Sequence, residues 1–164
     1  MAKRILMIVR MKAPANRMGA ALAAGRLARE SGGAIRMMYV SPLPPPRLDR
    51  DDRVVADTDR EMARIAGEAE EELRQLTAEL GDVPVECVVR FGRLGREVAR
   101  EAESFGADLV ALAAPAPPGR VDRALAWYLE RLVLGSITPV VLLPEIAPRG
   151  AARPRGALAT TVLR

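Results

Sequence analysis

Short apolar runs alternate along this chain with longer segments of helical periodicity, and no other feature constrains the fold as strongly. The runs are too short to be helices and lack a regular polar alternation, which is typical of strands buried on both faces of a parallel sheet. We predict strands at residues 5–9, 34–40, 83–89, 108–113 and 139–143. We predict helices at 17–31, 58–80 and 93–105, and a fourth that begins at Asp122. This order predicts an α/β fold, a Rossmann-like open five-stranded parallel sheet with helices on both faces.

Local signals mark where the predicted helices begin and end. Asn16 is a suitable N-cap for the first helix, and Thr58 with Glu61 has the spacing of a capping box for the second. Gly81 and Gly106 stand directly after the second and third helices, where glycine often closes a helix. The first helix also carries alanines on one face, which would allow it to lie close to the sheet.

The segment 41–57 interrupts this regular pattern. It contains prolines at 42 and 44–46, followed by a charged stretch at 47–53. Proline-rich and charged segments of this kind form stiff, exposed loops. A lid over a binding site and a plain surface insertion are both compatible with this composition.

The chain divides into an α/β domain at residues 1–144 and a basic tail, rich in Pro, Arg and Ala, at 145–164. The tail carries four arginines and one glutamate, so it accounts for about +3 of the formal net charge of +4. The domain itself is nearly balanced and has few aromatic residues, 3% of the chain. Nucleic-acid surfaces usually combine a basic stripe with aromatics, so the composition argues against a nucleic-acid partner.

Histidine and cysteine usage excludes several kinds of chemistry. The chain has no histidine, which removes Ser-His-Asp and Cys-His nucleophile sites and the common zinc sites. The single cysteine, Cys87, lies in the apolar run 85–89, where we expect it to be buried and structural. We therefore predict neither an enzyme nor a metal site, with residual nucleotide hydrolysis the one catalytic activity left open. No apolar run is long enough for a membrane span, and no signal peptide is evident, which predicts a cytoplasmic protein.

Several segments, in this order and spacing, resemble the universal stress protein family in its single-domain form. The resemblance extends over residues 3–144 and implies an adenine-nucleotide alpha-hydrolase-like fold. The segments that carry it are Lys3–Leu6, Val88–Gly92 with Glu97–Val98, Ala102–Ala113, Glu130–Val133 and Thr138–Leu142.

The resemblance also shows a departure from the family's ATP-binding members. Those members carry G-x-x-G-x9-G-[ST] after the fourth strand, a loop whose glycines let the backbone approach phosphates. The equivalent positions here are Ala113, Ala116, Ala126 and Trp127, and prolines at 115, 117 and 118 remove further amide donors. Gly135-Ser136 resembles a remnant of this motif. It stands at the end of the fourth predicted helix, where the partial negative charge repels phosphate, so we interpret it as a helix stop.

A second departure concerns the first strand, after which the family's nucleotide binders tend to carry an acidic residue. Arg10 stands at that position here, with Lys12 two residues later. One interpretation is an altered anion site at the crevice between the first and fourth strands, and the other is solvated loop charge. The candidate crevice residues are Arg10, Lys12, Val40, Ala113, Ala116, Gly119 and Arg120.

The family resemblance implies a homodimer formed through the last strand, because an apolar edge strand needs a partner or a cover. The candidate edge residues are Pro139, Val140, Val141, Leu142 and Leu143. The sequence thus favours a dimeric stress-response module that acts through an unknown protein partner and requires no cofactor, with ATP disfavoured. The alternative is a regulator that binds a nucleotide or another anionic metabolite in the altered crevice.

Overall fold

The computed structural model describes residues 3–10, 14–114, 119–133 and 138–144. The predicted strands and helices are present, with ends displaced by no more than three residues. The elements are β1 (Arg4–Ile8), α1 (Pro14–Ser31), β2 (Ala34–Ser41), β3 (Arg47–Leu48), β4 (Val54–Ala56), α2 (Thr58–Ala78), β5 (Val85–Phe91), α3 (Leu94–Phe105), β6 (Leu109–Ala114), α4 (Arg120–Val133) and β7 (Val140–Pro144).

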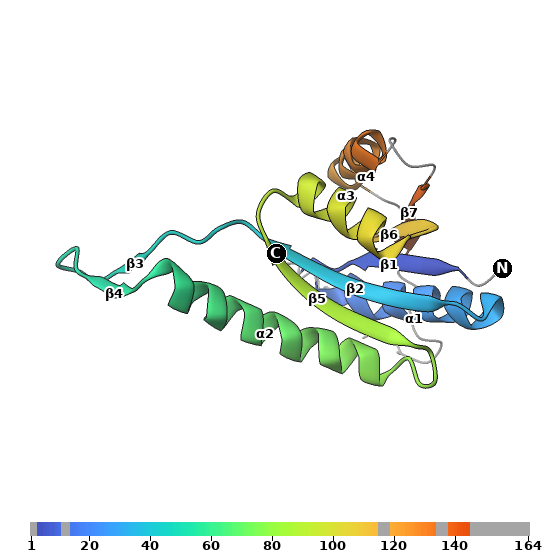
Figure 1. Ribbon diagram of the computed structural model, residues 1–164, viewed down its shortest axis with the longest axis horizontal. Helices are drawn as coiled ribbons and strands as arrows, with labels where there is room; N and C mark the ends of the chain where they lie inside the picture. The colour runs from blue at the N-terminus through green and yellow to red at the C-terminus, as the bar shows by residue number, and fades with distance from the viewer. Residues whose placement is uncertain (1–2, 11–13, 115–118, 134–137, 145–164) are drawn as a thin grey trace, which may run out of the picture.

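The main sheet is parallel and has the strand order β5-β2-β1-β6-β7. Helices α3 and α4 cover one face, and α1 and α2 cover the other (Figure 1). This confirms the predicted open sheet with helices on both faces. The chain runs outward from β1 to β2 and β5, and then continues on the other side of β1 with β6 and β7. The strand order therefore reverses at β1 and β6, which makes their carboxyl ends the natural place for a ligand.

Small side chains let α1 lie close to the sheet. Ala20, Ala21, Ala24 and Ala28 are completely buried against it, as the alanine face of this helix predicts. The central strand β1 is buried on both faces, because successive side chains enter the two cores in turn. A core built from aliphatic side chains therefore holds the sheet and positions the ends of β1 and β2.

The predicted N-caps of the first two helices are wrong. Helix α2 is capped by Asp57, whose Oδ1 accepts a hydrogen bond from the Arg60 amide at 2.9 Å, and Thr58 is already helical. Asp57 thus takes the capping position one residue earlier than predicted, and the Glu61 carboxylate bonds to Arg64 instead. Helix α1 begins at Pro14, so Asn16 lies within it. The predicted glycine stop at Gly106 is confirmed, because this residue closes α3 with φ 64°.

The expectation that Cys87 is buried is wrong. Its side chain is exposed, because β5 forms the edge of the sheet and pairs only with β2 in the described ranges. The Cys87 Sγ lies 3.4 Å from the Thr77 Oγ1 of α2. The apolar run around it identifies a strand but does not show which strand lies at an edge.

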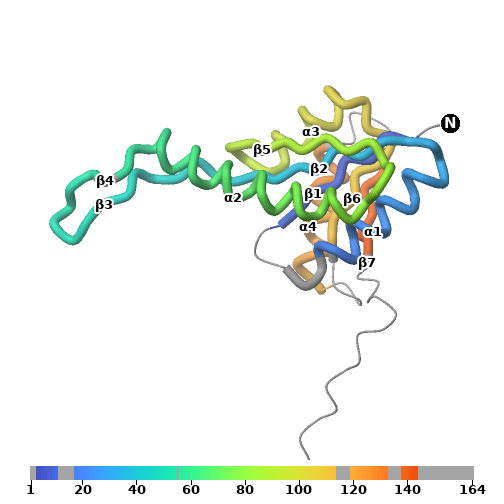
Figure 2. Tube along the Cα trace, turned by 90° about the horizontal axis from the view of Figure 1, so that it is seen from below, coloured from blue at the N-terminus to red at the C-terminus, as the bar shows by residue number. Residues whose placement is uncertain are grey.

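The segment 41–57, predicted as an irregular loop, contains the antiparallel pair β3 and β4. The turn between them is held by Asp49, whose Oδ1 accepts hydrogen bonds from the amides of Asp51 and Arg53. Two views show this hairpin projecting outward beyond the carboxyl ends of the strands, away from the sheet (Figures 1 and 2). Among the described helices, none is both long and apolar enough to cross a membrane.

Candidate functional site

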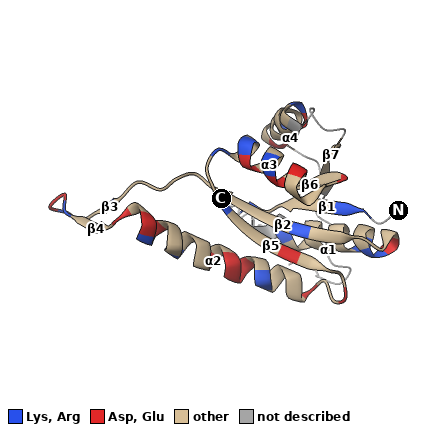
Figure 3. Ribbon diagram, viewed as in Figure 1, with Lys and Arg blue, Asp and Glu red and all other residues tan. Residues whose placement is uncertain are grey.

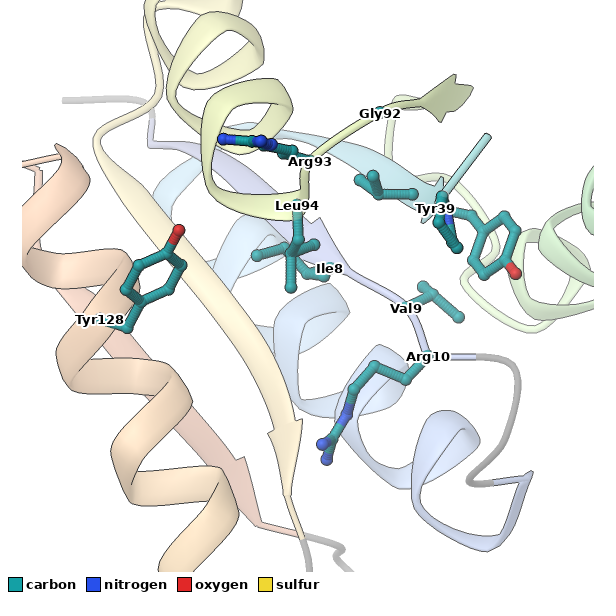
Figure 4. A pocket seen from close by; sticks show the side chains of 10 residues that line it. Ile8, Val9, Arg10, Tyr39, Gly92, Arg93, Leu94 and Tyr128 are labelled. Carbon is teal, nitrogen blue, oxygen red and sulfur yellow. The ribbon is translucent and has the colours of Figure 1, made fainter. Parts of the chain in front are cut away.

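A crevice of about 720 Å³ lies at the carboxyl ends of β1 and β2, beside the start of α3 (Figure 4). Its walls are mainly apolar, and it lies at the end of the sheet where α/β proteins bind ligands. Tyr128 lies on one side of the crevice, near Leu94 and Ile8, whereas the ring of Tyr39 points away from it toward α2. The lining residues are Ile8, Val9, Arg10, Tyr39, Val40, Pro42, Gly92, Arg93, Leu94 and Tyr128.

Gly92 shapes one wall of the crevice by turning the chain from β5 into α3. Its φ of 150° is rarely adopted by residues with a side chain, and its amide donates to the Ser41 carbonyl at 2.8 Å. A Cβ at this position would also lie 3.0 Å from the Glu97 Oε1. The turn therefore depends on glycine, and it brings Arg93 and Leu94 next to the ends of β1 and β2.

A second glycine brings α4 to the crevice. A Cβ at Gly95 would overlap Leu132 of α4 and lie 3.0 Å from the Tyr128 hydroxyl oxygen. The bare backbone at Gly95 thus allows α3 and α4 to approach closely. This contact places Tyr128, whose side chain is half-exposed, in the crevice wall.

The charged part of the site is an ion pair between Arg10 and Asp122. The Arg10 Nη2 donates to the Asp122 Oδ1 at 2.7 Å and to the Ala113 carbonyl of β6 at 2.9 Å. The other carboxylate oxygen of Asp122, Oδ2, accepts a hydrogen bond from the Gly119 amide at 3.0 Å. The Arg10 Nε is buried and has no hydrogen-bond partner among the residues that the structure describes. Asp122 therefore joins the end of β1 to the start of α4.

The pKa of Asp122 lies below its usual range, chiefly because the Arg10 side chain donates a hydrogen bond to it. The Gly119 amide acts in the same direction, whereas burial opposes both. The carboxylate is therefore ionised at neutral pH and compensates the Arg10 charge. Figure 3 shows that other charges of both signs are interleaved along α2 and α3.

The structure brings together part of the predicted site. Arg10 and Val40 line the crevice, and Ala113 contributes its backbone carbonyl as the partner of Arg10. Gly119 and Arg120 lie at the start of α4, where both are exposed. Lys12 and Ala116 lie outside the described residues, as do Gly135 and Ser136.

The position of Asp122 in the fourth helix was predicted wrongly, and its ion pair with Arg10 was not predicted. Asp122 was predicted as the cap of the fourth helix, but α4 begins at Arg120, and the carboxylate in its first turn bonds back to Gly119. The three-residue spacing from Gly119 could have indicated this bond. The sequence also gave no sign that Tyr39, Arg93 and Tyr128 share a crevice, because they come from three separate elements. The positions equivalent to the family's last glycine and hydroxyl, Ala126 and Trp127, lie within α4.

The predicted dimer edge is an edge of the sheet in the described ranges. Strand β7 pairs with β6 and has no second neighbour there. Pro139 is exposed, and Val140, Val141, Leu142 and Leu143 are half-buried. Within the same ranges, no group of three or more His, Cys, Asp or Glu side chains could hold a metal ion.

Comparison with known proteins identifies the family. The sequence model of the universal stress protein family matches residues 1–144, most of the chain. This chain belongs to the universal stress protein family. A search of curated proteins gave no match for this universal stress protein.

Solved structures of the family share its fold. A universal stress protein from Burkholderia pseudomallei is 19% identical with a TM-score of 0.57, and the alignment covers 87% of this chain and 96% of that one. One from Lactobacillus plantarum is 15% identical with a TM-score of 0.62, covering 87% and 97%. One from Arabidopsis thaliana, solved with AMP bound, is 13% identical with a TM-score of 0.54, covering 88% and 93%. At these identities the likeness establishes the fold alone.

Proposed function

We propose that this universal stress protein is a dimeric regulatory module that works without the glycine-loop mode of ATP binding. The ion pair between Arg10 and Asp122 carries the proposal. The Asp122 carboxylate accepts hydrogen bonds from Arg10 at the end of β1 and from the Gly119 amide that precedes α4. Both groups are donors of the kind that a phosphate would need.

A triphosphate at this end of the sheet would have to displace the chain's own carboxylate. Asp122 is buried and ionised, and its two oxygens take donors from separate parts of the chain. The loop positions that hold glycine in ATP-binding members are alanines here, and three prolines remove further donors. These features support a module for which ATP is not a required cofactor.

The same ion pair weighs against the alternative, an anionic-metabolite site built on Arg10, Lys12 and Arg120. Such a site would need Arg10 to release both Asp122 and the Ala113 carbonyl. Catalysis is also outside the proposal, because the described lining of the crevice contains no carboxylate and the chain contains no histidine. General acid-base chemistry thus lacks an evident donor or acceptor in the crevice.

The dimer in this proposal forms through β7, and we place the protein in the cytoplasm, where it would act on a protein partner. The free side of β7 in the described ranges supports this arrangement, since exposed backbone groups on an edge strand pair readily with a second strand. Light scattering coupled to size-exclusion chromatography should give the mass of two chains at micromolar concentration. A single-chain mass would remove the dimer from the proposal.

The nucleotide part of the proposal is tested on the purified full chain. Denaturing extraction should release no bound nucleotide, and calorimetric titration with ATP and magnesium should give no binding heat. Micromolar ATP binding would show that the donors around Arg10 and α4 are available after all, and would favour the anionic-metabolite alternative.

A further inference from the structure

We propose that residues 42–57, an arm that ends in the β3–β4 hairpin, dock on helix α4 of a second copy of this chain. The contact is reciprocal, because each copy carries both the arm and the helix. This inference goes beyond the proposed function, since it assigns an interface that is separate from the dimer edge at β7.

Exposed apolar side chains gather in two places on the described part of the chain, the arm and α4. Three of the exposed large apolar side chains lie on the arm and four lie on α4. Single apolar residues scattered over a surface are ordinary, whereas groups of them mark interaction sites. The residues are Leu43, Leu48 and Val54 on the arm, and Val121, Trp127, Tyr128 and Leu132 on α4.

The arm presents two of its apolar side chains on one face. Leu48 of β3 and Val54 of β4 stand directly opposite each other in the antiparallel pair, so their side chains project from the same face of the hairpin. The turn beyond them is fixed by the hydrogen bonds that Asp49 accepts. A two-stranded hairpin is only marginally stable in water on its own, so a partner that covered this face would stabilise the arm.

Helix α4 presents an apolar stripe along its exposed side. Val121, Tyr128 and Leu132 are spaced seven and four residues apart, which places them on one line along the helix. Trp127 precedes Tyr128 and is also exposed, with the Arg131 guanidinium carbon 5.0 Å from the centre of its ring. Tryptophan, tyrosine and arginine are the residues most enriched among those that dominate the affinity of protein interfaces.

The fold keeps the arm away from α4 of its own chain. The arm joins β2 to α2 and projects outward past the ends of the strands, whereas α4 packs on the opposite face of the sheet from α2 (Figures 1 and 2). Contact between the two apolar groups therefore needs a second molecule. A second copy satisfies both groups at once, because a two-fold axis would place each arm on the α4 of the other copy.

The charges around the two groups are also complementary. The turn of the arm, residues 49–53, carries three aspartates and two arginines, all of them exposed. The exposed charges on α4 are mainly positive, because Asp122 is buried against Arg10. Complementary charges of this kind steer two surfaces together and set their orientation. The exposed charged residues of α4 are Arg120, Arg123, Glu130 and Arg131.

The stripe on α4 is separate from the β7 edge. Helix α3 packs against β1 and β2 whereas α4 packs against β7, and Tyr128 and Leu132 lie on the side of α4 next to Gly95 of α3. A chain paired through β7 therefore keeps its arm and its stripe free. Each group has only a few side chains, which is typical of a small, transient interface. We therefore expect the contact to form at about 100 µM, above the concentration at which a β7 dimer forms.

Light scattering of the full chain over a concentration series measures this contact independently of β7. The mass at low micromolar concentration defines the basic unit, which is two chains if β7 pairs and one chain if it does not. We expect the mass of the wild-type chain to rise above that unit at about 100 µM. Leu48→Glu on the arm and Val121→Glu on α4 should each raise the concentration required by at least about tenfold, because each places a charge in the contact.

The variants are chosen so that folding is preserved. Leu48 is 50% exposed and Val121 is 75% exposed, so a glutamate at either position meets water in the unassociated chain. Ala78→Glu is the matched control, because Ala78 is exposed at the end of α2 that is far from the arm. This variant should associate as the wild-type chain does.

A mixture of the two variants tests which surfaces meet. The Val121→Glu chain keeps a native arm and the Leu48→Glu chain keeps a native α4, so the mixture can form one intact contact of the arm with α4. We expect the mixture to associate at a lower concentration than either variant alone. If arms met arms or helices met helices, no contact between the two variants would be intact on both sides.

Three results would overturn the inference. The first is a wild-type mass that stays at the basic unit up to about 1 mM. The second is equal association of the wild-type, Leu48→Glu and Val121→Glu chains, which would leave the arm and α4 to a different protein. The third is a mixture that associates no better than its two components, which would contradict the pairing of the arm with α4.

Discussion

The two ends of the parallel sheet are closed in different ways. At the amino end, the Asp108 carboxylate accepts the Arg4 amide, and the Arg4 side chain donates to the Phe105 carbonyl at 3.0 Å. Gly33 packs directly against the Lys3 backbone, with no room for a side chain. At the carboxyl end, the strands open into a crevice with one ion pair in its corner.

A carboxylate accepts a backbone amide at both ends, yet the consequences differ. Asp108 is exposed and serves local chain geometry, whereas Asp122 is buried and also compensates an arginine that lines a cavity. The same chemical contact is structural at one end and electrostatic at the other. The parallel topology creates this difference, because it directs every strand's carboxyl end, and the loop that follows, to one side.

The largest effect on stability is expected at the amino end. Gly33→Ala would place a Cβ against the Lys3 carbonyl group, and backbone cannot yield as a flexible side chain can. We expect the free energy of unfolding to fall by about 3 kcal/mol in urea titrations. Gly67→Ala is the matched control, because a Cβ there would meet no described atom beyond the adjacent backbone of its own helix within 4 Å, and it should stabilise α2 by up to about 1 kcal/mol. Equal stability of the two variants would show that the amino end is less tightly closed than the contacts indicate.

At the carboxyl end, Asp122→Ala should lower the free energy of unfolding by about 2 kcal/mol at pH 7. It removes the carboxylate that compensates the Arg10 charge and leaves the Gly119 amide without its side-chain acceptor, while Arg10 keeps the Ala113 carbonyl. Asp108→Ala should lower it by less than about 1 kcal/mol, because the Arg4 amide at that end is exposed and can bond to water. Urea titrations measure the loss of unfolding free energy in each variant. A larger loss for Asp108→Ala would show that the contact at the amino end contributes more to stability than the Asp122 ion pair.

The pH dependence of stability should carry the signature of Asp122. Its pKa is lower in the folded chain than in the unfolded chain, mainly because of the Arg10 hydrogen bond. The resulting stabilisation is fully present above the unfolded pKa of about 4 and is lost as the pH falls through the lower folded value. Urea titrations between pH 5 and the acid limit of folding should therefore show a steeper loss for wild type than for Asp122→Asn. Parallel curves would indicate that the ion pair contributes nothing to stability.

The smallest effect on stability is expected for Tyr128→Ala. The side chain is 48% exposed, so its loss should lower the free energy of unfolding by less than about 1 kcal/mol. Trp127→Ala is the control, since Trp127 is exposed on α4 and is absent from the described crevice lining. Urea titrations measure both variants, and a loss of more than about 1 kcal/mol in each would point to a general disturbance of α4.

Local signals in the sequence predicted the sheet, its helices and the Gly106 stop, because apolar periodicity and glycine conformation act over a few residues. Relations between distant residues could not be predicted in this way. Arg10 and Asp122 are 112 positions apart, and the residues around each give no indication that the two pair. The exposure of Cys87 depends on the strand order, which the apolar run around it does not encode. Arg10 and Val40 line one crevice as the prediction grouped them, but the pairing of Arg10 with Asp122 was missed.

The most direct test of the ion pair between Arg10 and Asp122 is a carbon-13 NMR titration of the Asp122 carboxyl group in the full chain and in Arg10→Gln. In the wild-type chain we expect this carboxyl group to titrate below the usual aspartate pKa, because Arg10 donates a hydrogen bond to it. In Arg10→Gln we expect its pKa to rise. The same pKa in both proteins would contradict the pairing and, with it, the role of Asp122 at the crevice.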